Sequence, residues 1–189
     1  MELRTGNLQL AYEYRDMTLL FSDIVGFTSY CASVPAEKVI YMLSELFGEF
    51  DAASSDFGVY KVHTIGDAYI VTNMPTRRER SEQEIFEDCN RVLMMAIRMI
   101  LLIRVMRKRV NHDSLDMRVG LHTGSFVAGV VGLNSLRFDI WGPDALAGNL
   151  VESDGKAGEI CCSEPCKRLM MSLAQPESPS KAPIHHVAF

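Results

Sequence analysis

Apolar positions along the first half of the chain alternate between strand and helix periods. Residues 17–25, "MTLLFSDIV", are almost continuously apolar and predict a buried strand. Residues 35–55 repeat their apolar side chains on one helical face, with Gly58 suited to a left-handed cap at the end. Residues 59–73, "VYKVHTIGDAYIVTN", predict two strands around a tight turn at Gly66.

The second half continues with a long helix and further strands. Ser81 and Glu84 have the S-x-x-E spacing of a capping box, which opens a helix with an apolar stripe. The segments "LDMRVGLHTG", "SFVAGVVG" and "LRFDIWG" predict strands, followed by a short helix at residues 143–153 and a strand at "AGEICCS". This order is the split βαβ plan of a ferredoxin-like α+β fold, with helices expected on one face of the sheet.

Composition excludes several classes of protein. The 189 residues suffice for one domain with a core, and a hydrophobic fraction of 48% with 23% charged residues is ordinary for a globular protein. A net charge of −5 argues against a nucleic-acid binder. The apolar stretch at 92–106 is interrupted by Arg98 and Arg104 and is shorter than the ~20 residues of a membrane span, so we expect an amphipathic helix. The segment "MELRTGNLQL" lacks the pattern of a signal peptide.

The cysteines form an odd set of five without repeating spacing. The cluster "CCSEPC" has no second cluster or histidine partner at the spacing of a zinc site, so free thiols in a reducing cytoplasm are expected. From Gln175 onward, "QPESPSKAP" is rich in proline and serine and predicts a flexible tail.

Two aspartates stand against apolar strands. Asp23 interrupts the strand at 17–25, and Asp67 follows the turn at Gly66. Two carboxylates ~4 Å apart repel by roughly 4 kcal/mol at an effective dielectric of 20, which a shared proton or a divalent cation would relieve. Alternatively, each aspartate caps a turn or a helix. Spacing alone leaves both interpretations open.

The segment "GFT", residues 26–28, joins the end of the first strand to the following helical region. Its backbone amides can point outward and bind an anion. An amide cradle beside a cation site is the arrangement that a nucleoside triphosphate requires.

At these residues the sequence resembles the class III nucleotide cyclases, the catalytic domains of adenylyl and guanylyl cyclases. The matching segments are "LLFSDIVGFTSY", "KVHTIGDAYIV", "MRVGLHTGSFVAGVVG", "FDIWG" and "GKAGEI". The resemblance implies a catalytic domain at 17–166, a lead-in at 1–16 and a divergent tail at 167–189. It also implies a head-to-tail dimer with nucleotide sites in the groove between two domains.

The resemblance assigns roles to individual residues. Asp23 and Asp67, with the carbonyl of Ile24, resemble the ligands of two Mg²⁺ or Mn²⁺ ions, one polarising the ribose 3′-hydroxyl and the other holding the leaving pyrophosphate. Arg118 resembles an arginine that contacts the triphosphate. The expected nucleotide-binding residues are Val25, Gly26, Phe27, Thr28, Ile65, Gly66 and Arg118.

Departures from the family are equally informative. Members that complete the site alone carry an asparagine and an arginine where this chain has Leu146 and Leu150, and leucine cannot stabilise the charge of phosphoryl transfer. His63 stands where the family reads the base with lysine or glutamate, and we interpret it as a strand residue that fills the groove. Asp139 resembles the adenylyl type.

The sequence therefore predicts the metal-supplying half of a two-part cyclase, active only with a complementary cyclase domain. It resembles the metal-bearing half of membrane adenylyl cyclases and the second catalytic domain of protozoan guanylyl cyclases. The second resemblance favours GTP over ATP and a cytoplasmic domain of a larger membrane-tethered protein. The alternatives are a silent regulatory or dimerisation module, and a polymerase palm or cyclic-dinucleotide synthase, which the acidic balance and the absence of a "GGDEF"-like turn disfavour.

Overall fold

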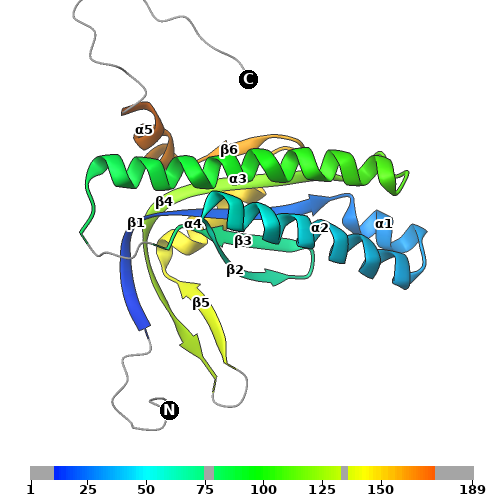
Figure 1. Cartoon of the computed structure of the whole chain (residues 1–189), viewed down its shortest axis with the longest axis horizontal. Helices are drawn as coiled ribbons and strands as arrows, with labels where there is room; N and C mark the ends of the chain where they lie inside the picture. Colours follow the sequence, from blue (N-terminus) through cyan, green and yellow to red (C-terminus); the bar gives the residue numbers. More distant parts are fainter. Residues whose placement is uncertain (1–10, 75–78, 133–135, 173–189) are drawn as a thin grey trace, which may run out of the picture.

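The computed structural model describes residues 11–74, 79–132 and 136–172 (Figure 1). The first half contains β1 (Ala11–Val25), α1 (Phe27–Ser33), α2 (Ala36–Phe57), β2 (Tyr60–Ile65) and β3 (Ala68–Thr72). The second half contains α3 (Glu82–Arg109), β4 (Asp116–Val131), β5 (Arg137–Trp141), α4 (Pro143–Ser153), β6 (Ile160–Cys162) and α5 (Glu164–Ser172).

The strands form one sheet in the order β2-β3-β1-β4-β5, and β6 pairs in parallel with β4. Four of these strands alternate with helices in the chain order β1, α2, β2, β3, α3, β4. This order is the predicted ferredoxin-like arrangement, so the α+β fold class is confirmed. One detail of the prediction was wrong: the two strands predicted at residues 115–124 and 125–132 are the single strand β4. The strand is not interrupted at Gly124, which pairs with Met17 of β1. Gly124 lies directly against the side chain of Asp144, which leaves no room for a side chain at this position.

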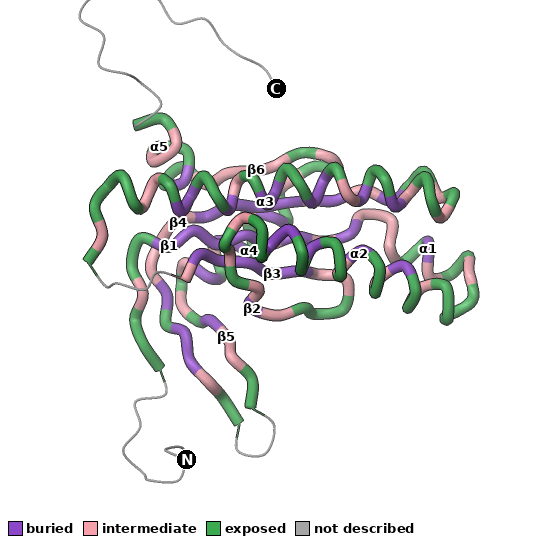
Figure 2. Tube along the Cα trace, in the orientation of Figure 1, coloured by how far each residue is buried: buried purple, intermediate pink, exposed green. Residues whose placement is uncertain are grey.

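Helices cover both faces of the sheet. The main core packs β1 residues such as Leu20 and Ile24 against α2 and α3, whereas a smaller core on the other face joins Leu19 and Phe126 to Ala145 of α4. Figure 2 shows α2 and α3 with buried inner faces along the sheet. The expectation of helices on one face therefore holds for α2 and α3 but not for α4, because the pattern of α4 does not specify which face it covers.

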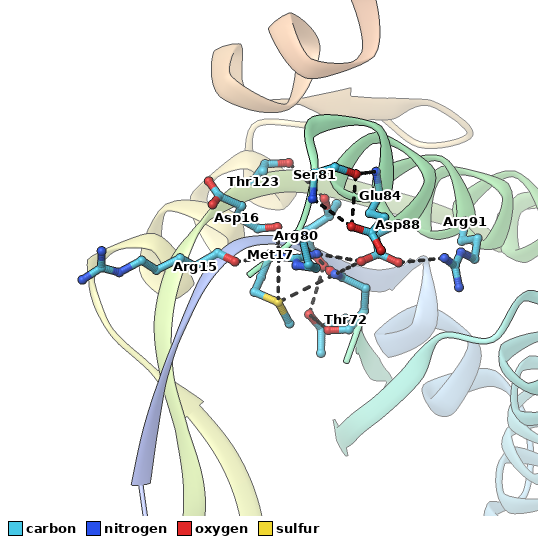
Figure 3. A network of polar contacts seen from close by, with 12 residues as sticks. Arg15, Asp16, Met17, Thr72, Arg80, Ser81, Glu84, Asp88, Arg91 and Thr123 are labelled. Atoms are coloured by element: carbon cyan, nitrogen blue, oxygen red, sulfur yellow. Dashed lines mark hydrogen bonds and ion pairs between the residues drawn. The ribbon is translucent and has the colours of Figure 1, made fainter. Parts of the chain in front are cut away.

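Strand β1 begins at Ala11, before the predicted start at 17, and contains an irregularity in its pairing with β4 between Tyr14 and Met17. Asp16 there has a φ of 53°. Arg80 donates from Nη2 to the carbonyls of Arg15 and Asp16, each over 2.7 Å, and thereby ties this irregularity to the start of α3 (Figure 3).

Local signals in the sequence predicted several element ends. Gly58 caps α2 with a φ of 64°, and Gly66 forms the β2–β3 turn with a φ of 62°. Ser81 and Glu84 form the predicted capping box of α3. The buried face of α3 includes Val92 and Met99, which confirms the amphipathic helix, and among the described residues no helix is long and apolar enough to cross a membrane.

Helix α5 was not predicted. Cys166 of α5 is fully buried, and its Sγ lies 3.8 Å from that of Cys89 on α3. All five cysteines carry free thiols. Residues 167–172 belong to α5, whereas the tail predicted from Gln175 onward and residues 75–78 of the link before α3 lie outside the described residues.

Candidate active site

Asp23 and Asp67 converge at one end of the sheet. Strand β1 pairs antiparallel with β3 up to the pair Ser22 and Tyr69, so Asp23 lies level with the β2–β3 turn that carries Asp67. Burial, followed by the charge of Asp23, raises the pKa of Asp67 to about 6. The two carboxyl groups therefore interact directly, and one of them binds a proton more readily than a free aspartate does.

The capping interpretation explains only part of this geometry. The backbone of Asp67 itself and that of Ile24 act to lower the pKa of Asp67, as capping amides would. Burial and the neighbouring Asp23 outweigh them, because the net pKa is raised. The negative charge at this turn is therefore not compensated by the local backbone, and a cation would relieve it.

The segment after Asp23 turns sharply into α1. Gly26 has a φ of 81°, and a Cβ at this position would lie 2.6 Å from the carbonyl oxygen of Ser114, so both backbone angle and space require glycine. Helix α1 begins at Phe27 without a side-chain cap, and Thr28 in its first turn is exposed. The first amides of α1 therefore lie close in the chain to Asp23 without a capping side chain.

Arg118 lies directly opposite Asp23 in the β1–β4 pairing. Its Nη2 donates to Oδ2 of Asp23 over 3.0 Å, and its Nε donates to Oε1 of Glu152 over 2.8 Å. Burial acts to lower the pKa of Arg118, but the hydrogen bonds and charges of Glu152 and Asp23 raise it overall. A permanent cation thus stands beside Asp23.

A groove of about 800 Å³ runs from this site across the sheet. Its lining comes from β1, β2, β3, β5 and α4, and includes Asp23, Ile65, Ala68, Trp141 and Glu152. This volume is in the range of small-molecule and cofactor sites. Asp23 lines the groove itself, and Ile65 and Ala68 at the base of the turn place Asp67 beside it.

His63 and Asp139 line the same groove on β2 and β5. Nδ1 of His63 is buried without a hydrogen-bond partner and lies 3.5 Å from Oδ1 of Asp139. Burial, opposed by the charge of Asp139, lowers the pKa of His63, so the imidazole is neutral at pH 7. His63 is therefore a largely buried strand residue whose ring faces the groove.

Leu146 and Leu150 lie one turn apart on α4 and are 69% and 64% exposed. Leu146 lines the groove. The two side chains therefore add an exposed apolar surface to α4 beside the groove.

The structure places the predicted site residues as follows. Asp23 lies beside both Asp67 and Arg118, Ile24 directly after it is buried at 2% exposure, and Gly26 begins the turn. Sequence reasoning missed Glu152, although a carboxylate inside the predicted helix at 143–153 was a signal for it.

No group of three or more His, Cys, Asp or Glu side chains within the described ranges forms a metal site, so metals here would need ligands beyond the two carboxylates. Mg²⁺ suits such a site, because it takes one or two carboxylates together with phosphate oxygens and water.

Comparison with known proteins identifies the family. The family model of the adenylate and guanylate cyclase catalytic domain matches residues 10–182. The chain belongs to this family. It is 42% identical over 170 residues, 90% of its length, to guanylate cyclase alpha of Plasmodium falciparum, and 44% identical over 170 residues, 89% of its length, to guanylate cyclase of Toxoplasma gondii. The chain spans about 4% of the length of each of these relatives.

Solved structures agree with the family. The guanylate cyclase domain of RhGC from Catenaria anguillulae in complex with GTP superposes with a TM-score of 0.73 at 28% identity, covering 85% of this chain and 84% of that one. A non-canonical dimeric guanylyl cyclase domain of the RhoGC fusion protein from Blastocladiella emersonii has a TM-score of 0.73 at 30% identity, covering 87% of this chain and 88% of that one.

Proposed function

We propose that this cyclase domain supplies the metal-binding and phosphate-binding half of a nucleotide cyclase. The reaction converts a purine nucleoside triphosphate into its 3′,5′-cyclic monophosphate and pyrophosphate. The observation that carries the proposal is the convergence of Asp23 and Asp67, incompletely compensated by the backbone, at the end of a groove of about 800 Å³, with Arg118 paired to Asp23.

Each residue has a distinct task. Asp23 and Asp67, with the carbonyl of Ile24, hold two Mg²⁺ or Mn²⁺ ions, which when bound neutralise the triphosphate and favour attack of the ribose 3′-hydroxyl on the α-phosphate. The amides from Val25 to Thr28 bind phosphate oxygens at the start of α1. Ile65 and Gly66 form the wall of the turn beside the nucleotide, and Arg118 adds a fixed positive charge near the phosphates.

The site is half of an active centre. Leu146 and Leu150 are exposed where family members that complete the site alone carry an asparagine and an arginine, and neither leucine can neutralise charge that develops in the transition state. We infer that a complementary cyclase domain brings these groups and the base-reading residues in a head-to-tail dimer, and that its apolar contact covers the two leucines. A fungal guanylyl cyclase domain with the same fold forms a dimer described as non-canonical, which supports association of two such domains but not the head-to-tail arrangement itself.

GTP is the favoured substrate, because the similar proteins of Plasmodium and Toxoplasma are guanylate cyclases. The chain spans about 4% of these relatives, which supports a role as one domain of a larger protein. Attachment of that protein to a membrane, with this domain in the cytoplasm, stays a prediction from the sequence resemblance.

The decisive experiment combines this chain with cyclase domains that carry the asparagine and the arginine, and measures product from GTP and from ATP with Mg²⁺ or Mn²⁺. We expect turnover, mainly of GTP, in the mixture and almost none with either partner alone. Asp67→Ala should abolish it. Robust turnover by this chain alone, lost in Asp67→Ala, would contradict the half-site. If the heterodimer forms but binds no non-cyclisable GTP or ATP analogue with metal in calorimetry, the domain is a silent regulatory module.

A further inference from the structure

The guanidinium of Arg118 forms ion pairs with two carboxylates that come from different elements. Its Nη2 contacts Asp23 at 3.0 Å, and its Nε contacts Glu152 on α4 at 2.8 Å. The side chains of Arg118 and Asp23 are each 33% exposed, whereas that of Glu152 is 8% exposed. Both carboxylates line the groove, but the contact with Glu152 is the more protected of the two and the contact with Asp23 the more exposed.

Close packing of α4 on the sheet fixes Glu152 in this place. A Cβ on Gly120 of β4 would collide with the backbone of Glu152, so the two backbones are in direct contact. Four residues earlier on α4, a Cβ on Gly148 would lie 2.7 Å from the ring of Phe21. These two glycines let α4 lie directly on β1 and β4, which leaves Glu152 little freedom to move away from Arg118.

We propose that Glu152 is a positioning residue that holds the Nε edge of Arg118, so that Nη2 alone is exchanged between Asp23 and the incoming metal-bound nucleotide. Before the nucleotide arrives, Arg118 serves as an internal counter-ion for Asp23. This inference rests on the proposed function, since the exchange requires the aspartates to take up a metal.

The charges explain why Glu152 matters for the exchange. A cation that binds Asp23 meets the guanidinium of Arg118 at the same carboxylate, and like charges repel. Glu152 pairs with the Nε edge of the guanidinium, and this second ion pair weakens the attraction between Arg118 and Asp23. Without that carboxylate, Arg118 pairs with Asp23 alone and opposes the metal more strongly.

The test is Mn²⁺ binding, measured calorimetrically on the full chain at pH 7.5 without nucleotide. Glu152→Gln keeps the size of the side chain and an acceptor for Nε but removes the charge. Arg118→Met removes the counter-ion. Asp154→Asn is the matched control, because Asp154 is exposed at the C-cap of the same helix, whereas Arg118 pairs with Asp23 and Glu152. Thermal unfolding of each variant checks that the fold is kept.

We expect Mn²⁺ affinity to fall about tenfold in Glu152→Gln, to rise in Arg118→Met, and to stay within about twofold of the wild type in Asp154→Asn. In the Arg118→Met background, Glu152→Gln should have almost no further effect, because Glu152 acts through Arg118. Opposite changes in two folded variants would not arise from loosening of the structure.

Two results would overturn the inference alone: unchanged Mn²⁺ affinity in Glu152→Gln, or an equal loss with and without Arg118, which would show that Glu152 acts directly on the metal. Failure of the wild-type chain to bind Mn²⁺, both alone and together with a non-cyclisable GTP analogue, would instead overturn the proposed metal site and, with it, the exchange.

Discussion

The carboxyl group of Asp67 lies beside that of Asp23, and burial together with the charge of Asp23 raises the pKa of Asp67 to about 6. A folded domain that keeps two acidic side chains in mutual repulsion loses stability by doing so. The repulsion is relieved by a proton below pH 6 and, in our account, by divalent metal at physiological pH.

Asp67→Asn should therefore stabilise the metal-free domain, and the gain should depend on pH. Because folding raises the pKa of Asp67 from 3.8 to about 6, the folded state holds this proton more tightly than the unfolded state. Its contribution to stability is complete below pH 3.8 and is lost as pH rises through 6. Since the group is partly exposed and screened, we expect a gain of about 1 kcal/mol for Asp67→Asn above pH 6.5.

Urea unfolding of the metal-free protein between pH 4 and 8 measures this difference. Asp56→Asn, at an exposed position of α2, is the control and should show no such pH-dependent gain. A difference between Asp67→Asn and the wild type that stays constant across this range would contradict the raised pKa.

Restoring the missing groups on α4 should create activity in the chain alone. Leu146→Asn combined with Leu150→Arg places the two polar groups on exposed positions, so the fold should tolerate them. In a head-to-tail homodimer each copy would then complete the metal site of the other. We expect product formation to rise by about 10²-fold over the wild-type chain, the magnitude of one transition-state donor.

Cyclic nucleotide formation from GTP and ATP at high protein concentration checks this gain. Leu146→Asn with Leu150→Gln is the matched control, and adding Asp67→Ala should remove the gain. If the charged and uncharged variants have equal activity, the departures at these two positions do not explain the half-site.

Because α4 packs closely on β4, we expect alanine substitutions at two glycines to change stability in opposite directions. Gly120→Ala would push Glu152 and α4 away from β4, and we expect a loss of about 2 kcal/mol in the free energy of unfolding together with weaker Mn²⁺ binding. Gly48→Ala in α2 meets nothing within 4 Å and should stabilise the helix by about 0.5–1 kcal/mol. Equal effects of the two variants in urea unfolding would show that α4 does not depend on this contact.

Arg80 and Asp88 join the start of α3 to β1, far from the candidate active site. We expect a large loss of stability when Asp88 is replaced. Asp88 accepts from Arg80 over 2.6 Å and from Asn73 over 3.0 Å, and the Arg80 side chain is only 6% exposed (Figure 3). Asp88→Ala leaves the buried guanidinium of Arg80 without its carboxylate partner and should cost about 3 kcal/mol.

An exposed ion pair provides the comparison for Asp88→Ala. Glu45 pairs with Arg109 at 3.2 Å with about half of each side chain exposed, so Glu45→Ala should change stability by less than about 0.5 kcal/mol. A loss below 1 kcal/mol in Asp88→Ala by the same urea unfolding would contradict the role of this network.

Sequence patterns predicted those features whose physical cause is local. A charge against an apolar strand marked Asp23 and Asp67, and the backbone needs of Gly58 and Gly66 marked the ends of their elements. The short helix predicted near residues 143–153 is α4, Pro143–Ser153. The face of the sheet that α4 covers was not predicted, because it depends on close contacts at Gly120 and Gly148 that no single segment encodes.

Glu152 and α5 escaped prediction for a related reason. The role of Glu152 follows from Arg118, which lies 34 residues earlier in the chain and meets it only when α4 docks on β4. Helix α5 depends on burial of Cys166 against Cys89 of α3, a contact across 77 residues. The fold class needs only the order of elements, whereas these contacts need the packed sheet.

The most direct measurement is a crystal structure of the domain with Mn²⁺ and a non-cyclisable GTP analogue, in which anomalous scattering locates the metal. Our account predicts peaks ~2 Å from carboxylate oxygens of both Asp23 and Asp67, with phosphate oxygens completing the ligands. Nucleotide bound without a metal peak at these aspartates, or metal bound elsewhere while Asp23 stays paired with Arg118, would contradict it.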